Sequence, residues 1–123
     1  MASIIIAAGP QGEGEYYPLG RRTTVIGRDE AVPVQVVDER VSRRHLQIRY
    51  EEGKGYIALD MRSANGSFVN GRRITDEVVL AEGDEIQIGD TKLHFTLNDF
   101  PDKQSAMAHF KKAGQKYRNT LMQ

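Results

Sequence analysis

A chain of 123 residues with 39% apolar residues has room for one hydrophobic core, so we expect one domain with a short extension. The formal net charge is zero, which argues against a protein whose main partner is nucleic acid or an acidic membrane. The absence of cysteine excludes disulfides, thiolate catalysis and cysteine-ligated metal sites. A cytoplasmic setting is therefore the expectation.

The longest apolar run near the N-terminus covers residues 4–8, and no basic segment precedes it. This run is too short for a signal peptide or a membrane span. It predicts the first β-strand.

Strand signals continue over most of the chain. Runs rich in Ile, Val, Thr, Tyr and Phe are separated by Gly, Pro, Asn and Asp, which is typical of short strands joined by turns. Apolar and polar residues alternate within 46–50, 86–88 and 93–97, so one face of these strands should meet a core and the other water. The predicted strands are residues 4–8, 23–27, 34–37, 46–51, 56–60, 67–70, 78–80, 85–89 and 92–97. Turn-forming residues between them favour mostly antiparallel neighbours.

The composition changes after residue 98. Residues 104–121 predict an amphipathic helix with an apolar stripe. The stripe contains Met107, Phe110, Tyr117 and Leu121. Residues 99–123 hold five basic and two acidic residues, whereas residues 1–98 hold twelve and fifteen, so the helix is basic and the body acidic. Three roles stay open for the helix: packing on its own domain, self-association, or contact with a partner or membrane surface.

Four short polar motifs occur in a fixed order between the predicted strands. They are Gly27-Arg28, Ser42-Arg43-Arg44-His45, Asn65-Gly66-Ser67 and Asn70-Gly71. A guanidinium, a hydroxyl and an amide at strand ends suit a phosphate flanked by extended backbone. Each motif taken alone also has a structural explanation as a surface cation or a turn. Their combination predicts a binding site, with no nucleophile–base pair.

The histidines give no sign of chemistry. His45 precedes an apolar strand, where a structural hydrogen-bonding role is commoner than catalysis. His94 falls on the polar face of its strand and His109 on the helix, so the three histidines predict no cluster. We therefore expect no catalytic residue, no metal site and no cofactor. The arginines lack interleaved stacking aromatics, so nucleic-acid binding is not expected either.

In order and spacing, the four motifs resemble those of the forkhead-associated (FHA) domain. The segment from Gly83 to Gly89 also resembles a turn-and-strand stretch of that family. The resemblance covers roughly residues 3 to 98 and implies a small single-domain protein of bacterial type. The implied fold is all-β, a SMAD-like sandwich of two antiparallel twisted sheets, here with an added C-terminal helix. We expect the sandwich domain over residues 1–98 and the helical extension over 99–123.

The family recognises phosphothreonine in extended peptides, and the resemblance assigns roles to individual residues. Arg28 and Ser42 would contact the phosphate, Arg43 would assist, and Asn65 would bind the ligand main chain. A second group would shape the loops: Gly27, His45, Gly66, Asn70 and Gly71.

Ala64 departs from the family pattern, which often has threonine or serine before Asn-Gly. Losing one hydrogen bond to a charged group costs about 1.5–3 kcal/mol if nothing replaces it. The backbone N–H of Ala64 and the side chain of Arg43 are candidates to replace it. We expect recognition to be weakened or reshaped.

The leading hypothesis is a non-enzymatic phosphothreonine-binding signalling module. Its partner would be a phosphorylated protein, a Ser/Thr kinase or its substrate, and neither nucleic acid nor a membrane. The alternative is a phosphate-independent scaffold that uses the sandwich surface and the helix, with self-association through the helix left open.

Overall fold

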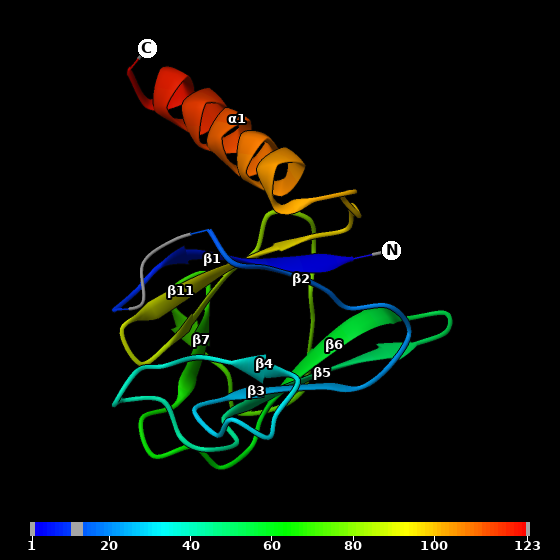
Figure 1. The fold of residues 1–123 in the computed structure, drawn as a ribbon, viewed down its shortest axis with the longest axis vertical. Helices are drawn as coiled ribbons and strands as arrows, with labels where there is room; N and C mark the ends of the chain where they lie inside the picture. Colours follow the sequence, from blue (N-terminus) through cyan, green and yellow to red (C-terminus); the bar gives the residue numbers. More distant parts are fainter. Residues whose placement is uncertain (1, 11–13, 123) are drawn as a thin grey trace.

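The structure is a computed structural model that describes residues 2–10 and 14–122, with side chains described up to residue 112. The described chain forms two β-sheets and then a helix (Figure 1). The elements are β1 (Ser3–Ala8), β2 (Tyr16–Pro18), β3 (Thr24–Gly27), β4 (Val34–Gln35), β5 (Leu46–Glu51), β6 (Gly55–Asp60), β7 (Ser67–Val69), β8 (Arg72–Arg73), β9 (Val78–Val79), β10 (Glu85–Ile88), β11 (Thr91–Thr96) and α1 (Lys103–Met122).

The strands form two sheets that pack as a sandwich. One has the order β2-β1-β11-β10-β7-β8, and the other β4-β3-β5-β6-β9. The paired strands run antiparallel, except that β4 runs parallel to β3. The predicted all-β sandwich with a C-terminal helix is therefore confirmed.

The core lies between the two sheets and follows the predicted alternation. On β5, Leu46 and Ile48 are buried while Gln47 is partly exposed. On β11, Leu93 and Phe95 are fully buried against them in the same cluster. Burying an aliphatic or aromatic side chain of this size contributes about 1.5–3 kcal/mol, so these alternating positions define which face of each strand turns inward.

Two short strands were absent from the predicted set. The strand β2 carries a proline and lies at a sheet edge, where only one side pairs, with β1. The strand β8 is two exposed arginines that pair with β7 at the opposite edge. Both lack the apolar alternation from which strands are predicted, because edge strands of this kind bury little.

The outer face of the six-stranded sheet is covered where α1 begins (Figure 1). Ile5 is fully buried but lies outside the sandwich core cluster, since its neighbours Ile4 and Ile6 point into that core. Ala106 on α1 is also fully buried, and α1 contacts β1. The first part of the helix thus packs on its own domain, which is the first of the three predicted alternatives.

The helix begins at Lys103 because Asp102 caps it. An oxygen of Asp102 accepts a hydrogen bond from the backbone N–H of Ser105 at 2.8 Å, the usual N-cap arrangement. Bonds from Ser105 lower the pKa of Asp102. The side chains of Tyr117 and Leu121, predicted to complete the apolar stripe, lie outside the described residues. Within the described chain, no helix has the length and apolar character that crossing a membrane requires.

Candidate functional site

Three of the four predicted motifs, Gly27-Arg28, Ser42–His45 and Asn65-Gly66-Ser67, meet in loops at the end of the sandwich opposite α1 (Figure 1). The fourth, Asn70-Gly71, does not join them and contacts Asp84 and Glu85 instead. We call residues 28–45 and 61–66 the distal loops. The first follows β3 and leads to β5; the second joins β6 in one sheet to β7 in the other. Side chains from both loops can therefore reach one ligand.

Gly27 sets how closely the distal loops approach β3. A Cβ at this position would lie 2.0 Å from the carbonyl oxygen of Arg43, which is far inside contact distance. The close approach allows Arg28 N–H to donate to Ser42 O at 3.0 Å and Asp29 N–H to donate to Arg43 O at 3.2 Å. Glycine is needed here for space, and its φ is not in the left-handed region.

The Arg28 side chain is exposed, and a hydrogen bond to the loop backbone fixes its position. Its Nε donates to the carbonyl of Val41 at 3.0 Å, while its own carbonyl accepts from Gln35 Nε2 at 3.2 Å. These bonds leave the two terminal nitrogens of the guanidinium for a ligand. A guanidinium presented in this way can bind a phosphate through paired, charge-assisted hydrogen bonds.

Ser42 links the two distal loops. Its Oγ accepts a hydrogen bond from the backbone N–H of Ala64 at 3.0 Å. The hydroxyl hydrogen can then be donated to an incoming anion. The N–H of Ala64, one of the two candidates to replace the missing hydroxyl, instead donates to Ser42.

Asn65 is exposed and is oriented by the other distal loop. Its Nδ2 donates to the carbonyl of Arg40 at 2.8 Å. The side-chain oxygen and a second N–H hydrogen are left for other partners, which is the donor and acceptor pair needed to bind an extended peptide backbone. Arg43 is exposed on the first distal loop, next to Ser42.

His45 is fully buried and holds the distal loops together. Its Nδ1 accepts from the N–H of Ser42 at 3.0 Å, and its Nε2 lies 2.8 Å from the carbonyl of Gly66. A backbone N–H can only donate and a carbonyl can only accept, so the ring is neutral with its proton on Nε2. A neutral ring with both nitrogens hydrogen-bonded has a structural role, since it connects the two distal loops.

Asp60, at the end of β6, organises the second distal loop. Its carboxylate accepts from the Ser63 hydroxyl at 2.5 Å, from the Ser63 N–H at 3.0 Å and from the Ser67 hydroxyl at 2.6 Å. Burial alone would raise the pKa of Asp60, but these hydrogen bonds outweigh it and lower the pKa. Ser63 Oγ in turn accepts from Gly66 N–H at 2.9 Å, so one carboxylate fixes the loop that carries Asn65.

A buried carboxylate, that of Asp38, ties the first distal loop to the turn between β10 and β11. It accepts from Asp90 N–H and from the Thr91 hydroxyl, both at 2.8 Å, and from Arg40 N–H at 2.9 Å. Burial opposes ionisation, but these bonds lower the pKa of Asp38. The Arg40 carbonyl that orients Asn65 is thereby fixed.

Asn70-Gly71 forms the predicted hairpin turn between β7 and β8. Both residues have positive φ, 51° and 82°, as a two-residue type I′ turn requires. The Asn70 side chain also donates to Asp84 and accepts from Glu85 N–H, so it braces the neighbouring strand β10.

An open groove of about 710 Å³ lies beside Arg28. It is lined by Pro10, Arg28, Gln35, Val37, Asp38, Glu39, Arg40 and Asp90. The groove extends the site along the first distal loop and adds Gln35, Arg40 and Val37 to the residues that sequence reasoning singled out. No local signal marks these residues, because their position depends on how the loop folds back on β3.

The histidine prediction is wrong in one respect. His94 and His109, expected to be isolated, come together with Glu82 where α1 packs on β11. Their separation in sequence conceals this, since only the docking of the helix on the sheet brings them together. Among the side chains described, this is the only group of metal-ligand type, and it lies outside the distal loops.

Comparison with known proteins shows the family to which the chain belongs. Residues 24–89, more than half of the chain, match the family model of the FHA domain. The chain is 36% identical over 107 residues to the glycogen accumulation regulator GarA of Mycolicibacterium smegmatis, covering 87% of this chain. It is 37% identical over 92 residues to the oxoglutarate dehydrogenase inhibitor of Corynebacterium diphtheriae, covering 75% of this chain. The matches span 66% and 62% of the lengths of these two relatives.

A solved structure shares the fold. It comes from a structural and functional analysis of phosphothreonine-dependent FHA domain interactions, and it superposes with a TM-score of 0.71 at 30% identity. The match covers 80% of this chain and 98% of that one. The sandwich therefore accounts for nearly all of the compared domain.

Proposed function

This chain belongs to the family of FHA domains, which bind phosphothreonine peptides, and we propose that Arg28, Ser42 and Asn65 make the main ligand contacts. The observation that carries the proposal is the hydrogen bond from Ala64 N–H to Ser42 Oγ. It holds the loop that presents a hydroxyl and a guanidinium against the loop that presents the asparagine.

In the proposed complex, the phosphate binds between Arg28 and Ser42. The terminal nitrogens of Arg28 and the hydroxyl of Ser42 donate to phosphate oxygens, and Arg43 adds positive charge from the next position. Asn65 pairs with the peptide backbone beside the phosphothreonine and so sets its register.

Ala64 removes one donor from this arrangement. A threonine or serine there would add a hydroxyl, and the Ala64 N–H is already bonded to Ser42. We infer that the phosphate is held by fewer side-chain donors than the family pattern provides, with Arg43 making up part of the difference.

The relatives named above are a regulator and an enzyme inhibitor. By analogy, we propose that this protein acts without catalysis, in the cytoplasm, by binding a partner that a Ser/Thr kinase has phosphorylated, or the kinase itself. Binding through distal loops on a rigid sandwich suits such a role, because the protein can change what its partner contacts without changing its own fold.

Calorimetric titration tests the proposal. A phosphothreonine peptide selected from an oriented library is compared with the same peptide carrying phosphoserine or threonine. We expect the phosphothreonine form to bind most tightly and the unmodified form not to bind measurably. Arg28→Ala should weaken binding by about 100-fold or more and Ser42→Ala by about 10- to 100-fold, because each removes charge-assisted hydrogen bonds.

Arg21→Ala is the matched control, since Arg21 lies over the Tyr50 ring and precedes β3, whereas Arg28 follows it. This variant should bind like the wild type. Equal affinity for the phosphorylated and unmodified peptides would contradict the proposal and favour a phosphate-independent scaffold. If both Arg28→Ala and Ser42→Ala instead lose the cooperative thermal unfolding transition, these residues have a structural role.

A further inference from the structure

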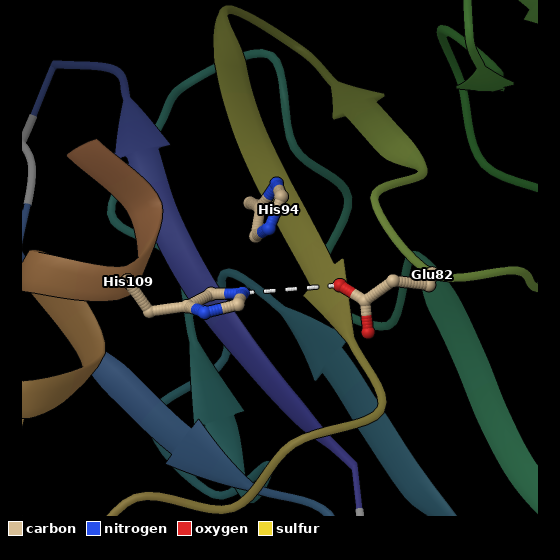
Figure 2. Close-up of side chains that lie close together, drawn as sticks. All are labelled: Glu82, His94 and His109. Atoms are coloured by element: carbon tan, nitrogen blue, oxygen red, sulfur yellow. Dashed lines mark ion pairs between the residues drawn. The ribbon is translucent and has the colours of Figure 1, made fainter. Parts of the chain in front are cut away.

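Glu82, His94 and His109 bring three metal-ligand groups together from three separate elements. Figure 2 shows His94 on β11, His109 on α1, and Glu82 in the segment that precedes β10. One ligand atom from each residue lies within 4.8 Å of the other two. The cluster therefore sits where the helix meets the sandwich.

The Glu82 carboxylate is already oriented. Its Oε1 accepts from the Thr96 hydroxyl at 3.0 Å and from Leu97 N–H at 2.8 Å. Its Oε2 faces His109 Nε2 at 3.9 Å, which is too long for a hydrogen bond (Figure 2). One oxygen is fixed by the protein and the other is directed at the histidines.

The two histidines are also placed by packing. The His94 ring lies 5.2 Å from that of Phe110, and the His109 ring 5.2 Å from that of Phe100, measured between ring centroids. His94 Nε2 is buried and has no hydrogen-bond partner. A buried polar atom without a partner is unfavourable and uncommon in native proteins.

We propose that Glu82, His94 and His109 bind a divalent transition-metal ion, with Zn²⁺ the best match, and that the ion fixes α1 to the six-stranded sheet. Two imidazole nitrogens and one carboxylate oxygen are a ligand set that Zn²⁺ accepts, at about 2.0–2.2 Å from the metal, with a fourth position for water. Tetrahedral ligands at that range lie about 3.4 Å apart, so small rotations of the side chains bring these atoms into place.

The chemistry of the cluster distinguishes this ion from other occupants. Mg²⁺ and Ca²⁺ prefer shells made of oxygen, and two of the three ligands here are nitrogens. An ion pair between His109 and Glu82 alone would leave His94 Nε2 unsatisfied. A transition-metal ion would use all three groups.

The consequence is that a bound metal ion would strengthen the packing of α1 on the sheet. Two ligands belong to the sandwich and one to α1, so the ion would join elements that otherwise meet through a small set of side chains. The distal loops share none of these residues. The metal site is therefore independent of the proposed phosphopeptide site.

The test uses the full chain without an affinity tag, titrated with ZnCl₂ in a calorimeter. We expect saturable binding at one Zn²⁺ per chain and none with Mg²⁺. His94→Gln, His109→Gln and Glu82→Gln should each weaken Zn²⁺ binding by more than about tenfold, since even the loss of an outer partner of a ligand costs about that much. The matched control is Glu52→Gln, which removes the same charge at an exposed position outside the cluster.

Histidine NMR gives a readout that needs no variant. Zn²⁺ should shift the ring signals of His94 and His109 but not those of His45, whose two nitrogens are already bonded. Amide exchange in the first turns of α1 should slow when Zn²⁺ is bound. Absence of saturable binding, unchanged affinity in the histidine variants, or a shift of His45 instead would overturn the site, and unchanged exchange in α1 would overturn its role in holding the helix.

Discussion

The two ends of this molecule are held together in different ways. At the distal loops, His45 and Asp60 form hydrogen bonds with the loop backbone, at Ser42 and Gly66 and at Ser63 respectively, and further donors remain for a ligand. At the helix end, α1 meets the sheet through Ala106 and through ring contacts of His109 and Phe110 with His94. A site built from backbone bonds can be fixed before its ligand arrives, whereas a docked helix can be fixed by its ligand.

The largest effect should come from Gly27→Ala. The new Cβ would meet the Arg43 carbonyl, which cannot move without breaking the bonds that hold the distal loops, so we expect a loss of about 3 kcal/mol in the free energy of unfolding. Urea denaturation measures the loss, and phosphopeptide affinity should fall with it. The control is Gly53→Ala, where the Cβ meets nothing and only the positive φ is unfavourable, at about 1 kcal/mol. Equal stability of the two variants would contradict the close approach of the Arg43 carbonyl to Gly27.

Asp60→Asn should cost about 2 kcal/mol at neutral pH, because it weakens hydrogen bonds to a charged group. The pKa of Asp60 is lower in the folded chain than its ordinary value of 3.8, so its contribution is present above that value and is lost as the pH falls through the folded pKa. The difference between wild type and variant should therefore shrink in acid. Urea titrations at pH 7 and below pH 3 measure this, and a difference that does not change with pH would refute it.

Phe110→Ala should act on the helix end alone. Losing its edge-to-face contact with His94 should cost about 1 kcal/mol, seen as faster amide exchange in α1. Phosphopeptide affinity should not change. Lys111→Ala, at the next and exposed position, is the control and should alter neither quantity. A drop in peptide affinity for Phe110→Ala would show that the two ends are coupled.

Ala64→Ser should give the smallest effect, confined to the distal loops. The added hydroxyl can donate to the phosphate, so the phosphothreonine peptide should bind a few-fold more tightly, a gain of about 0.5 kcal/mol. Calorimetry with the threonine peptide provides the control, because its binding should not improve. Weaker phosphopeptide binding would mean that Arg43 already occupies this space.

The sequence was most informative where chemistry is local. Alternation on β5 and β11 predicted which residues are buried, and Asn70-Gly71 predicted its turn, because each pattern depends on neighbours along the chain. The strand β8 was missed because two exposed arginines carry no apolar signal. The identity of the partner of the Ala64 N–H was also missed, since it depends on Ser42 of another loop.

The cluster at the helix end shows most clearly which kind of feature sequence patterns do not predict. Glu82, His94 and His109 are far apart in sequence and lie on three kinds of segment, so no spacing rule connects them. Asp38 and Asp60 were missed for the same reason, because a carboxylate becomes structural only when a second loop supplies its donors. Contacts between segments that are distant in sequence could not be predicted, and both proposed sites are formed by such contacts.

The loop from Asp60 to Ser67 passes from one sheet of the sandwich to the other, and Asn65 lies on that crossing. Arg28 and Ser42 belong only to the sheet that the crossing leaves. A peptide bound to both Arg28 and Asn65 would resist sliding of one sheet relative to the other. Mechanical pulling that slides one sheet over the other should then require more force when the phosphopeptide is bound, and the melting temperature should rise with peptide concentration.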